Sequence, residues 1–482
     1  MKQLKIAIAN RGEVAVRIAR ACYELGHKSL LLHSEPDRQS IAYRVCDETA
    51  CIGPGPSPES YLHIERVVDA AKNNGADALH PGFGFLSENA DFARACKKAG
   101  LIFIGPEPES MDLFGDKISA KDFCEKVKVP TLKSYRGKDQ SIKKLIQEAE
   151  AIGYPVLIKA AAGGGGRGMR AVSSPKDFED ALNSAKSEAL KAFGSDQVFL
   201  ERYLPVSKHI EVQIFGTLNE GVFILGEREC SVQRRHQKII EEALAPSLNP
   251  ELREKVYSYA KELAASSGYL GAGTVEFLFA DGEFYFLEVN TRLQVEHPVT
   301  EEVFDVDLVQ AQIKTALGES INWKQEALTP EDHSIECRVY AENSQGFPSV
   351  GEIGSLIFGF EQEHDNIRIE SGFERGDKIS PFYDSMIAKV ICTAESREQA
   401  IEDLTLYLEN TFVTGLQTNI PLLIEILNHK EFKDATMKTD FFENNFKEGL
   451  TPPLDEETLV QAAKLCLQQS SVDSLFSRGW RL

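Results

Sequence analysis

The first third of the chain alternates short apolar runs with segments of helical spacing. Four apolar runs predict buried strands, at Lys5–Ala9, Ser29–His33, Ala78–His80 and Leu101–Gly105. Between them, apolar positions recur at helical spacing in Val14–Leu25, Tyr61–Asn73 and Ala90–Lys98, and Gly26 is placed to end the first of these helices. Because strands and helices alternate, the pattern indicates a doubly wound parallel sheet.

Polar residues follow two of these strands. Asn10, Arg11 and Gly12 come directly after the first strand, and the segment His80–Glu88 (HPGFGFLSE) follows another. In a parallel sheet of this kind, the ligand crevice lies outside the carboxyl ends of the strands. Ordinary loops would account for both segments, but their polar tips favour a place in such a crevice.

The pattern changes along the rest of the chain. A second region begins near residues 115–128 and is rich in β-type segments and glycine runs over about 154–317. A third region, about 333–446, combines strand patterns and glycine-rich turns with a helical stretch at Arg397–Leu408. Helical spacing returns at Glu456–Gln468, close to the end.

Composition and charge narrow the class of protein. The chain has 482 residues, of which 42% are hydrophobic and 26% charged. This is globular composition, and at about 150 residues per domain it predicts about three domains. Lys and Arg number 53 against 74 Asp and Glu, for a net charge of −21. A chain this acidic is a poor general binder of nucleic acid or anionic membranes, so we expect neither as a partner.

The cysteines and apolar runs bear on the compartment. The chain has nine scattered cysteines and no CxxC pair, which is typical of buried thiols in a reducing compartment. No apolar run approaches the roughly 18 residues of a membrane span. The first residues, MKQLKIAIANRGE, lack the layout of a signal peptide. We therefore expect a cytoplasmic protein.

A glycine-rich segment, Pro155–Arg170, follows an apolar strand that carries Lys159. Its four consecutive glycines, Gly163–Gly166, cost backbone entropy, and such runs suit places where backbone N–H groups approach anionic oxygens. The Walker A pattern GxxxxGK[ST] is absent. Met169–Val172 predicts a second strand, which makes the segment a flap between strands. A flexible hairpin tip is the alternative, but the preceding lysine favours phosphate binding.

Two further segments carry candidate polar groups. Glu201–His209 (ERYLPVSKH) offers a carboxylate, backbone groups and a histidine that suit a nucleotide base and ribose, although ordinary surface residues would have the same pattern. Glu227–Glu242 (ERECSVQRRHQKIIEE) gathers several cations in an acidic chain: Arg228, Arg234, Arg235, His236 and Lys238. These form either a solvated basic patch or, if they face the glycine segment, an anion clamp with Lys238 as a point charge.

The most informative segment is Gly273–Glu301, in which two apolar runs flank Asp281-Gly282, a strong hairpin signal. Glu276 lies in the first strand and Glu288 in the second. A strict two-residue turn would pair Glu276 with Leu287 and send the two carboxylates to opposite faces. A three-residue loop would pair Glu276 with Glu288 directly. We predict that loop, Asp281–Glu283, or an equivalent bulge.

Opposed glutamates in an apolar hairpin repel one another. They suit a site where divalent cations lie between the carboxylates and a triphosphate, and oxygen ligands of this kind favour Mg²⁺. Two glutamates on a wet sheet face are the alternative. Along an extended strand, Glu288, Asn290 and Arg292 share one face, and Gln294 and Glu296 continue the alternation. They add a bidentate anion fork, an amide and a potential base.

Together these segments resemble the biotin carboxylase component of biotin-dependent carboxylases, in the ATP-grasp superfamily. Over about residues 4–446, eight motifs occur in the family's order: IANRGEVAVRIARA, HPGFGFLSEN, GDKISAK, IKAAAGGGGRGMR, ERECSVQRRHQKIIEE, EFLFADGEFYFLEVNTRLQVEHPVTE, ECRVYAE and PFYDSMIAKV. The resemblance implies an α/β protein (α+β overall) in four parts. These are an N-terminal doubly wound parallel-sheet domain (1–115), an ATP-grasp domain (116–330) with a mobile glycine-rich lid (about 131–204), a C-terminal mixed α+β domain (331–446) and a tail or linker (447–482).

The resemblance also implies a reaction. MgATP, bicarbonate and biotin on a biotin carboxyl carrier protein or domain give carboxybiotin, ADP and phosphate through carboxyphosphate. This is the first half-reaction of an acetyl-, propionyl- or methylcrotonyl-CoA carboxylase or of a pyruvate carboxylase. A carboxyltransferase subunit is then a partner, in a homodimer or a larger hetero-oligomer. Phosphoryl transfer depends mainly on positioning and charge neutralisation.

Roles pass from the family to the positions that match its motifs. ATP contacts are implied for Lys117, Lys159, Gly165, Gly166, Glu201, Arg202, Tyr203, Leu204, His209, Gln233 and His236. Coordination of Mg²⁺, or of Mn²⁺ in its place, is implied for Glu276, Glu288 and Asn290. Bicarbonate contacts are implied for Lys238, Arg292, Gln294 and Val295, with Glu296 as general base. Arg338 would stabilise the enolate-like oxygen of deprotonated biotin, and released phosphate would be the base that removes the proton from biotin. Phe83 stands where the family often has Tyr, so only an aromatic contact with biotin is expected there.

Other interpretations remain open. Another ATP-grasp carboxylate or carbamate ligase, such as a carbamoyl-phosphate synthetase half or a purine-pathway carboxylase, should lack ECRVYAE and PFYDSMIAKV. A non-catalytic ATP-binding module should have lost Glu288, Asn290, Arg292 or Glu296, and all four are present. No Met-Lys-Met biotinylation site occurs, so we expect that the chain does not carry its own biotin. The closing segment SLFSRGWRL resembles the point where α-subunits of acyl-CoA carboxylases continue into later domains, so we expect a separate subunit or a fragment of a longer chain. Dimer contacts of the bacterial forms are not evident around Asn366–Arg368.

Overall fold

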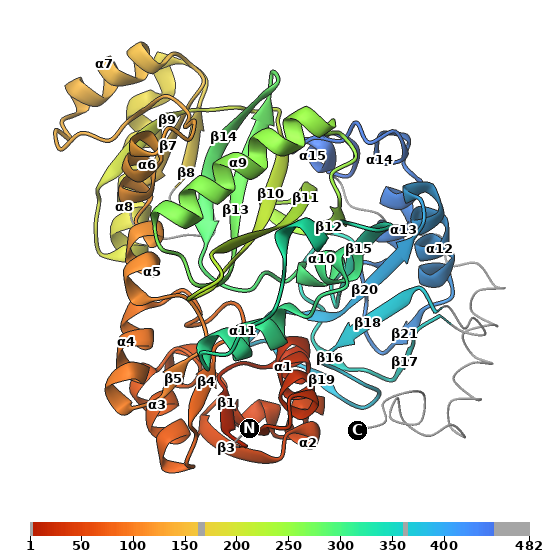
Figure 1. Ribbon diagram of the computed structural model, residues 1–482. Helices are drawn as coiled ribbons and strands as arrows, with labels where there is room; N and C mark the ends of the chain where they lie inside the picture. Colours follow the sequence, from red (N-terminus) through yellow and green to blue (C-terminus); the bar gives the residue numbers. More distant parts are fainter. Residues whose placement is uncertain (1–2, 162–168, 360–364, 448–482) are drawn as a thin grey trace.

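The computed structural model describes residues 3–161, 169–359 and 365–447 (Figure 1). The glycine flap with Gly165 and Gly166, its expected mobility and the helical run at Glu456–Gln468 lie outside the described residues.

The N-terminal region contains the predicted parallel sheet, with strand order β3-β2-β1-β4-β5. Its strands are β1 (Lys5–Ile8), β2 (Lys28–Ser34), β3 (Glu48–Gly53), β4 (Ala78–His80) and β5 (Ile102–Phe103). The helices are α1 (Gly12–Glu24), α2 (Ile41–Val45), α3 (Ile64–Asn73) and α4 (Ala90–Ala99). The doubly wound prediction is confirmed, although the sequence interpretation missed β3 and α2.

A small four-stranded sheet follows, with strand order β6-β9-β7-β8. Its strands are β6 (Ser134–Tyr135), β7 (Val156–Ala160), β8 (Met169–Val172) and β9 (Val198–Arg202). The helices here are α5 (Pro108–Gly115), α6 (Lys117–Lys126), α7 (Ile142–Ile152) and α8 (Phe178–Phe193). Strands β7 and β8 pair antiparallel with Lys159 opposite Met169, so the predicted strands on both sides of the glycine flap are confirmed.

The centre of the molecule is an eight-stranded antiparallel sheet in the order β14-β13-β10-β11-β12-β15-β20-β18. Its strands are β10 (Lys208–Gly216), β11 (Val222–Arg234), β12 (Gln237–Ala243), β13 (Gly271–Ala280), β14 (Glu283–Asn290), β15 (His333–Tyr340), β18 (Ile367–Ser371) and β20 (Met386–Ala394). Helices α9 (Pro250–Ser266), α10 (His297–Phe304) and α11 (Leu308–Ala316) pack around it. Because β12 pairs with β15, one sheet joins the second and third regions.

The C-terminal region adds two short strand pairs and a helical layer. The pairs are β16 (Gly351–Glu352) with β19 (Lys378–Ile379), and β17 (Ser355–Ile357) with β21 (Phe412–Thr414). The helices are α12 (Arg397–Glu409), α13 (Ile420–Asn428), α14 (Lys430–Lys433) and α15 (Phe441–Asn445). Of these, α12 and α13 lie to the right of the sheet in Figure 1, and α12 confirms the predicted helix. Every helix in the described part of the chain is too short or too polar to cross a bilayer.

Candidate active site

The β13–β14 hairpin brings the two glutamates together as predicted. The turn itself has two residues, Asp281 and Gly282, because Ala280 pairs with Glu283. A bulge then shifts the register between Glu276 and Phe277, so that Glu276 lies directly opposite Glu288. The bulge form of the prediction is confirmed. Both left-handed turn residues, Asp281 with φ 53° and Gly282 with φ 78°, suit a tight turn of this kind.

The predicted alternation beyond Glu288 is wrong in part. Strand β14 ends at Asn290, and the chain then turns, so that Glu296 is the N-cap residue of α10. The functional side chains of this stretch therefore converge from a loop instead of a strand face. Arg292 Nη1 donates to Gln294 Oε1 at 2.7 Å, and Arg292 Nη2 donates to Asn290 Oδ1 at 3.3 Å.

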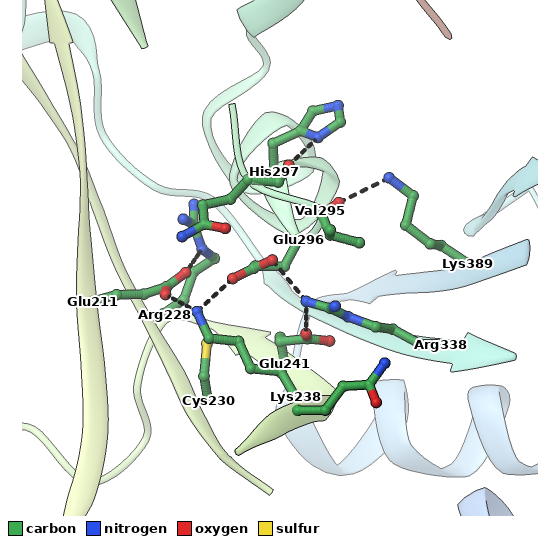
Figure 2. Close-up of polar contacts among 12 residues, drawn as sticks. Glu211, Arg228, Cys230, Lys238, Glu241, Val295, Glu296, His297, Arg338 and Lys389 are labelled. Atoms are coloured by element: carbon green, nitrogen blue, oxygen red, sulfur yellow. Dashed lines mark hydrogen bonds and ion pairs between the residues drawn. The ribbon is translucent and has the colours of Figure 1, made fainter. Parts of the chain in front are cut away.

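Lys238 of β12 occupies the centre of the site. Its ammonium donates to Glu276 Oε1 at 2.9 Å and to Glu296 Oε1 at 2.7 Å, and it also contacts Glu211 of β10. Figure 2 shows Lys238 between the carboxylates of Glu211 and Glu296. One cation thus joins the hairpin that carries the glutamate pair to the helix that carries Glu296.

The charges around Lys238 fix its ionisation and that of its partners. Burial opposes the charge on Lys238, but its three carboxylate neighbours raise the pKa well above the ordinary value. Burial likewise opposes ionisation of Glu296, yet Lys238 and Arg338 outweigh it and hold the pKa of Glu296 well below its usual range. Glu276 follows the same rule, with its pKa lowered by Lys238 and His209 against burial. These groups are therefore charged at neutral pH.

Arg338 of β15 lies on the other side of Glu296. Its Nη2 donates to Glu296 Oε2 at 2.8 Å and forms an ion pair with Glu241 of β12 (Figure 2). Burial and the neighbouring Glu296 raise the pKa of Glu241, and Arg338 lowers it, with a net pKa of about 7. A single guanidinium therefore stabilises two buried carboxylates that would otherwise repel one another.

Glu288 differs from the other carboxylates of the site in its lack of a close cation. Among the described residues, no cation is within ion-pair distance of it, and its own burial together with Glu276 raises its pKa. Lys117 at the start of α6 is the cation that lowers the pKa of Glu288 most, and burial lowers the pKa of that lysine. An unpaired carboxylate opposite a second carboxylate, with the amide of Asn290 beside them, offers the hard oxygen donors that fit Mg²⁺.

The anion side of the site contains Arg292 and Gln294. Gln294 Nε2 donates to Glu276 Oε1 at 3.3 Å, and Arg292 Nε lies 3.4 Å from Glu88 Oε2. Glu88 ends the predicted crevice segment, and Glu88 Oε1 also accepts from the backbone N–H of Thr291. The N-terminal loop therefore reaches the anion side, a contact that the sequence interpretation did not foresee.

The two predicted crevice segments meet. Asn10 Nδ2 donates to the carbonyl oxygens of Pro81 and Phe83, at 2.6 and 2.7 Å. Phe83 itself is half-buried. The ends of β1 and β4 thus share one rim of the site, as the parallel sheet predicted.

The predicted nucleotide groups divide into two sets. His209 of β10 joins the core of the site, because its Nε2 lies 3.1 Å from Glu276 Oε2 and its Nδ1 lies 3.0 Å from Gln233 Nε2. His236 and its neighbour Arg235 form the exposed turn between β11 and β12. Arg202, Tyr203 and Leu204 leave β9, and the first two donate backbone N–H groups to Lys133 O and Pro155 O.

Glu201 and Lys159 are tied to each other. Both are buried, and the Glu201 carboxylate accepts from Lys159 of β7 and from Lys121 of α6. Burial opposes its ionisation, but Lys159 and Lys121 outweigh burial and lower the pKa of Glu201 to about 2. Lys121 was not predicted. The pair joins α6 to the small sheet.

Glu201→Gln should therefore destabilise the protein, because it leaves two buried lysines without a counter-charge. We expect a loss of about 3–5 kcal/mol in the free energy of unfolding at pH 7. Because the folded-state pKa is below the unfolded one, the difference from wild type should shrink as pH falls from about 4.3 toward about 2. Thermal unfolding measures it, with Glu188→Gln in the exposed Arg170–Glu188 pair as control. Equal melting temperatures for wild type and Glu201→Gln would contradict the pairing.

Several polar residues of the site were missed or misread from sequence. Glu211 and Arg228 are fully buried, and Arg228 donates to Glu211, Gln213 and Thr300. The cationic segment is thus neither a solvated patch nor a simple clamp: Arg228 and Lys238 point inward to acids, while Arg235 and His236 are exposed. A usable signal was Glu211 between Ile210 and Val212 of β10, since a charge flanked by apolar residues in a strand needs a buried partner.

Three family models match successive parts of the chain. Residues 2–111 match the biotin carboxylase N-terminal domain, residues 116–324 match the carbamoyl-phosphate synthase L chain ATP-binding domain, and residues 336–444 match the biotin carboxylase C-terminal domain.

Relatives agree with these matches. The methylcrotonoyl-CoA carboxylase subunit alpha of Dictyostelium discoideum is 44% identical over 95% of this chain, which spans only 66% of that protein's length. The biotin carboxylase of Haemophilus influenzae is 45% identical over 91% of this chain and 98% of its own length. A crystal structure of the biotin carboxylase domain dimer of Hydrogenobacter thermophilus 2-oxoglutarate carboxylase, with MgADP, ADP and bicarbonate, has 41% identity and a TM-score of 0.88, covering 92% of this chain and 98% of that one.

Proposed function

The chain belongs to the biotin carboxylase family, and from this we propose that it catalyses the MgATP-dependent carboxylation of biotin by bicarbonate, through carboxyphosphate. The observation that carries the proposal is the position of Lys238. It contacts Glu276, which belongs to the candidate metal pair, and Glu296, the candidate base. A phosphoryl donor bound beside Glu276 and a small anion bound beside Glu296 would then be neighbours.

We propose the following roles for the chain's own residues. The Arg292 fork and the Lys238 ammonium hold bicarbonate, with Gln294 and the Val295 N–H as further donors. Glu296 takes the bicarbonate proton, since Lys238 and Arg338 keep it ionised. Glu276, Glu288 and Asn290 would hold Mg²⁺, which when bound neutralises phosphate charge. Lys117, Lys159, Gly165 and Gly166 contact ATP phosphates, and Glu201, Arg202, Tyr203, Leu204, His209, Gln233 and His236 surround adenine and ribose.

Arg338 and Phe83 are proposed to serve the second step. Arg338 lies 2.8 Å from Glu296, so an enolate oxygen that it stabilised would be close to the carboxyl donor. The carbon–oxygen bond of carboxyphosphate breaks and gives carbon dioxide and phosphate. The released phosphate takes the N–H proton of biotin, and that nitrogen then forms the new bond to carbon dioxide. Phe83 supplies an aromatic contact from the rim of the N-terminal sheet.

The test is ATP cleavage by the purified chain with Mg²⁺. ADP release should require bicarbonate and should increase when free biotin is added. Glu288→Gln, purified in the same way, reports any contaminating ATPase. If biotin and bicarbonate leave ADP release at the level of that variant, the proposed function is wrong.

Partners, assembly and compartment follow from the same proposal. We propose a biotin carboxyl carrier protein or domain and a carboxyltransferase subunit as partners, and a homodimer or larger hetero-oligomer as the assembly. We propose the cytoplasm as the compartment, supported by eight unpaired cysteines in the described residues. The proposed domain limits are 1–115, 116–330 and 331–446, with 447–482 as a tail. As the final acceptor we propose acetyl-, propionyl- or methylcrotonyl-CoA or pyruvate.

A further inference from the structure

We infer that Lys389 of β20 is a positioning residue for the bicarbonate site. Its ammonium donates to the carbonyl oxygen of Val295 at 2.8 Å, one residue before the proposed base Glu296. Figure 2 shows Lys389 reaching Val295 from the side opposite Lys238. Lys389 lies in the PFYDSMIAKV motif, to which none of the proposed roles assigns a residue. The inference rests on the proposed function, because the Val295 N–H and Glu296 face bicarbonate only in that proposal.

Sheet register pairs Lys389 with Arg338. The two residues are directly opposite in the β15–β20 ladder, so their side chains leave the same face of the sheet. Arg338 donates to the Glu296 carboxylate, and Lys389 donates to the Val295 carbonyl. Two neighbouring cations on one rigid sheet thus hold both ends of the Val295–Glu296 unit.

The burial of Lys389 calls for a specific reason. Its side chain has 0% exposure, and its second partner is Glu13 of α1, at 3.2 Å. Taking a lysine and a carboxylate out of water costs more than a weak pair returns, and apolar residues of similar size often serve stability as well or better. Lys389 also lowers the pKa of the buried Glu336 and of Glu370, its partner on β18, so it supplies counter-charge to this region. Counter-charge alone does not require the direct contact with the Val295 carbonyl, and a fixed carbonyl beside the anion site gives a reason for that contact.

The neighbouring carbonyl is anchored as well. His297 Nδ1 lies 2.8 Å from the carbonyl oxygen of Gln294. Burial, with help from Lys389, lowers the pKa of His297 well below its usual value, so the ring is neutral and Nδ1 carries the proton that it donates. With the carbonyls of Gln294 and Val295 both held, the peptide planes of this loop have defined orientations. The Val295 N–H and the Glu296 side chain are then aimed by the protein before bicarbonate arrives.

Lys389→Met tests the inference. We expect kcat/KM for bicarbonate to fall about 10- to 100-fold, the cost of a small misplacement of reacting groups, while KM for MgATP stays near that of wild type. Hydrogen exchange in the loop around Val295 should become faster, a readout that needs no activity. Because Lys389→Met leaves Glu13 without its cation, the double variant Glu13→Gln/Lys389→Met should show the same kinetic loss with a melting temperature closer to wild type.

Lys208→Met is the matched control. Lys208 is also a largely buried lysine that donates to a carboxylate, Glu229 at 2.7 Å, and to a carbonyl, Ala435 O at 2.9 Å. It should lower the melting temperature without lowering kcat/KM for bicarbonate relative to that for MgATP. A wild-type bicarbonate kcat/KM in Lys389→Met, or unchanged exchange around Val295, would overturn the positioning role. An inactive wild type would instead overturn the proposed function, which separates the two failures.

Discussion

Glu288→Gln should lose at least about 100-fold in kcat for bicarbonate-dependent ATP cleavage, the scale of removing one group that stabilises developing charge. Among the described residues no cation lies within ion-pair distance of Glu288, and the bulge in β13–β14 places it directly opposite Glu276. Its charge is therefore unfavourable until a cation binds, and an amide would remove the repulsion. We expect the melting temperature without nucleotide to stay the same or rise while activity is lost.

Glu283→Gln is the control on the same strand. Glu283 lies at the other end of β14, in an exposed pair with Lys255, and its replacement should change neither activity nor stability by much. The decisive comparison is between melting temperature and activity in Glu288→Gln, with and without MgATP. A parallel loss of both would mean that Glu288 stabilises the fold, and the metal assignment would fail.

The hairpin shows why some of the site could be predicted. An Asp-Gly turn fixes the end of the ladder, and each residue beyond it follows by counting. Counting back from a two-residue turn placed Glu276 and Glu288 on opposite faces of the hairpin. A metal site needs them on the same face, so the proposed chemistry also predicted a longer loop or a bulge. The structure has the bulge, at Glu276. Counting could not predict the side-chain directions beyond Asn290, because β14 ends there and the chain is no longer paired with another strand.

The buried charges could not be predicted in the same way. Glu201 pairs with Lys121, 80 residues away, and Arg338 contacts Glu296, 42 residues away. Each charge looks like a solvated residue until its partner is known. The same reason explains the misread cationic segment, since the direction of Arg228 depends on Glu211 across the β10–β11 ladder.

The fold could likewise be predicted only in part. The parallel sheet could be predicted from alternating runs because its inner strands are almost entirely buried, as in β1 and β4. Strand β3 was missed because it lies at the sheet edge and is largely half-buried, with polar residues in the run. The pairing of β12 with β15 joins segments about 90 residues apart, such as Glu242 and Ile335, and no local pattern marks it.

Arg338→Ala should separate the two chemical steps. Arg338 contacts Glu296 and Glu241 but none of the proposed nucleotide groups, so KM for MgATP should stay near wild type. If Arg338 stabilises the enolate-like oxygen of biotin, carboxylation of biotin should fall about 100- to 1000-fold. Bicarbonate-dependent ATP cleavage without biotin should be reduced far less, because Lys238 still pairs with Glu296.

The single variant also leaves two buried carboxylates facing each other. Glu241 already has a pKa of about 7 with Arg338 in place, since it is buried beside Glu296, so losing the guanidinium should favour its protonation or destabilise the fold. Arg338→Ala/Glu241→Gln removes that imbalance, and Glu241→Gln alone measures its own effect. If the double variant regains the wild-type melting temperature but not biotin carboxylation, the loss belongs to the chemistry of Arg338. Weakened MgATP binding in the double variant would contradict the role, because a biotin-side cation has no reason to affect the nucleotide.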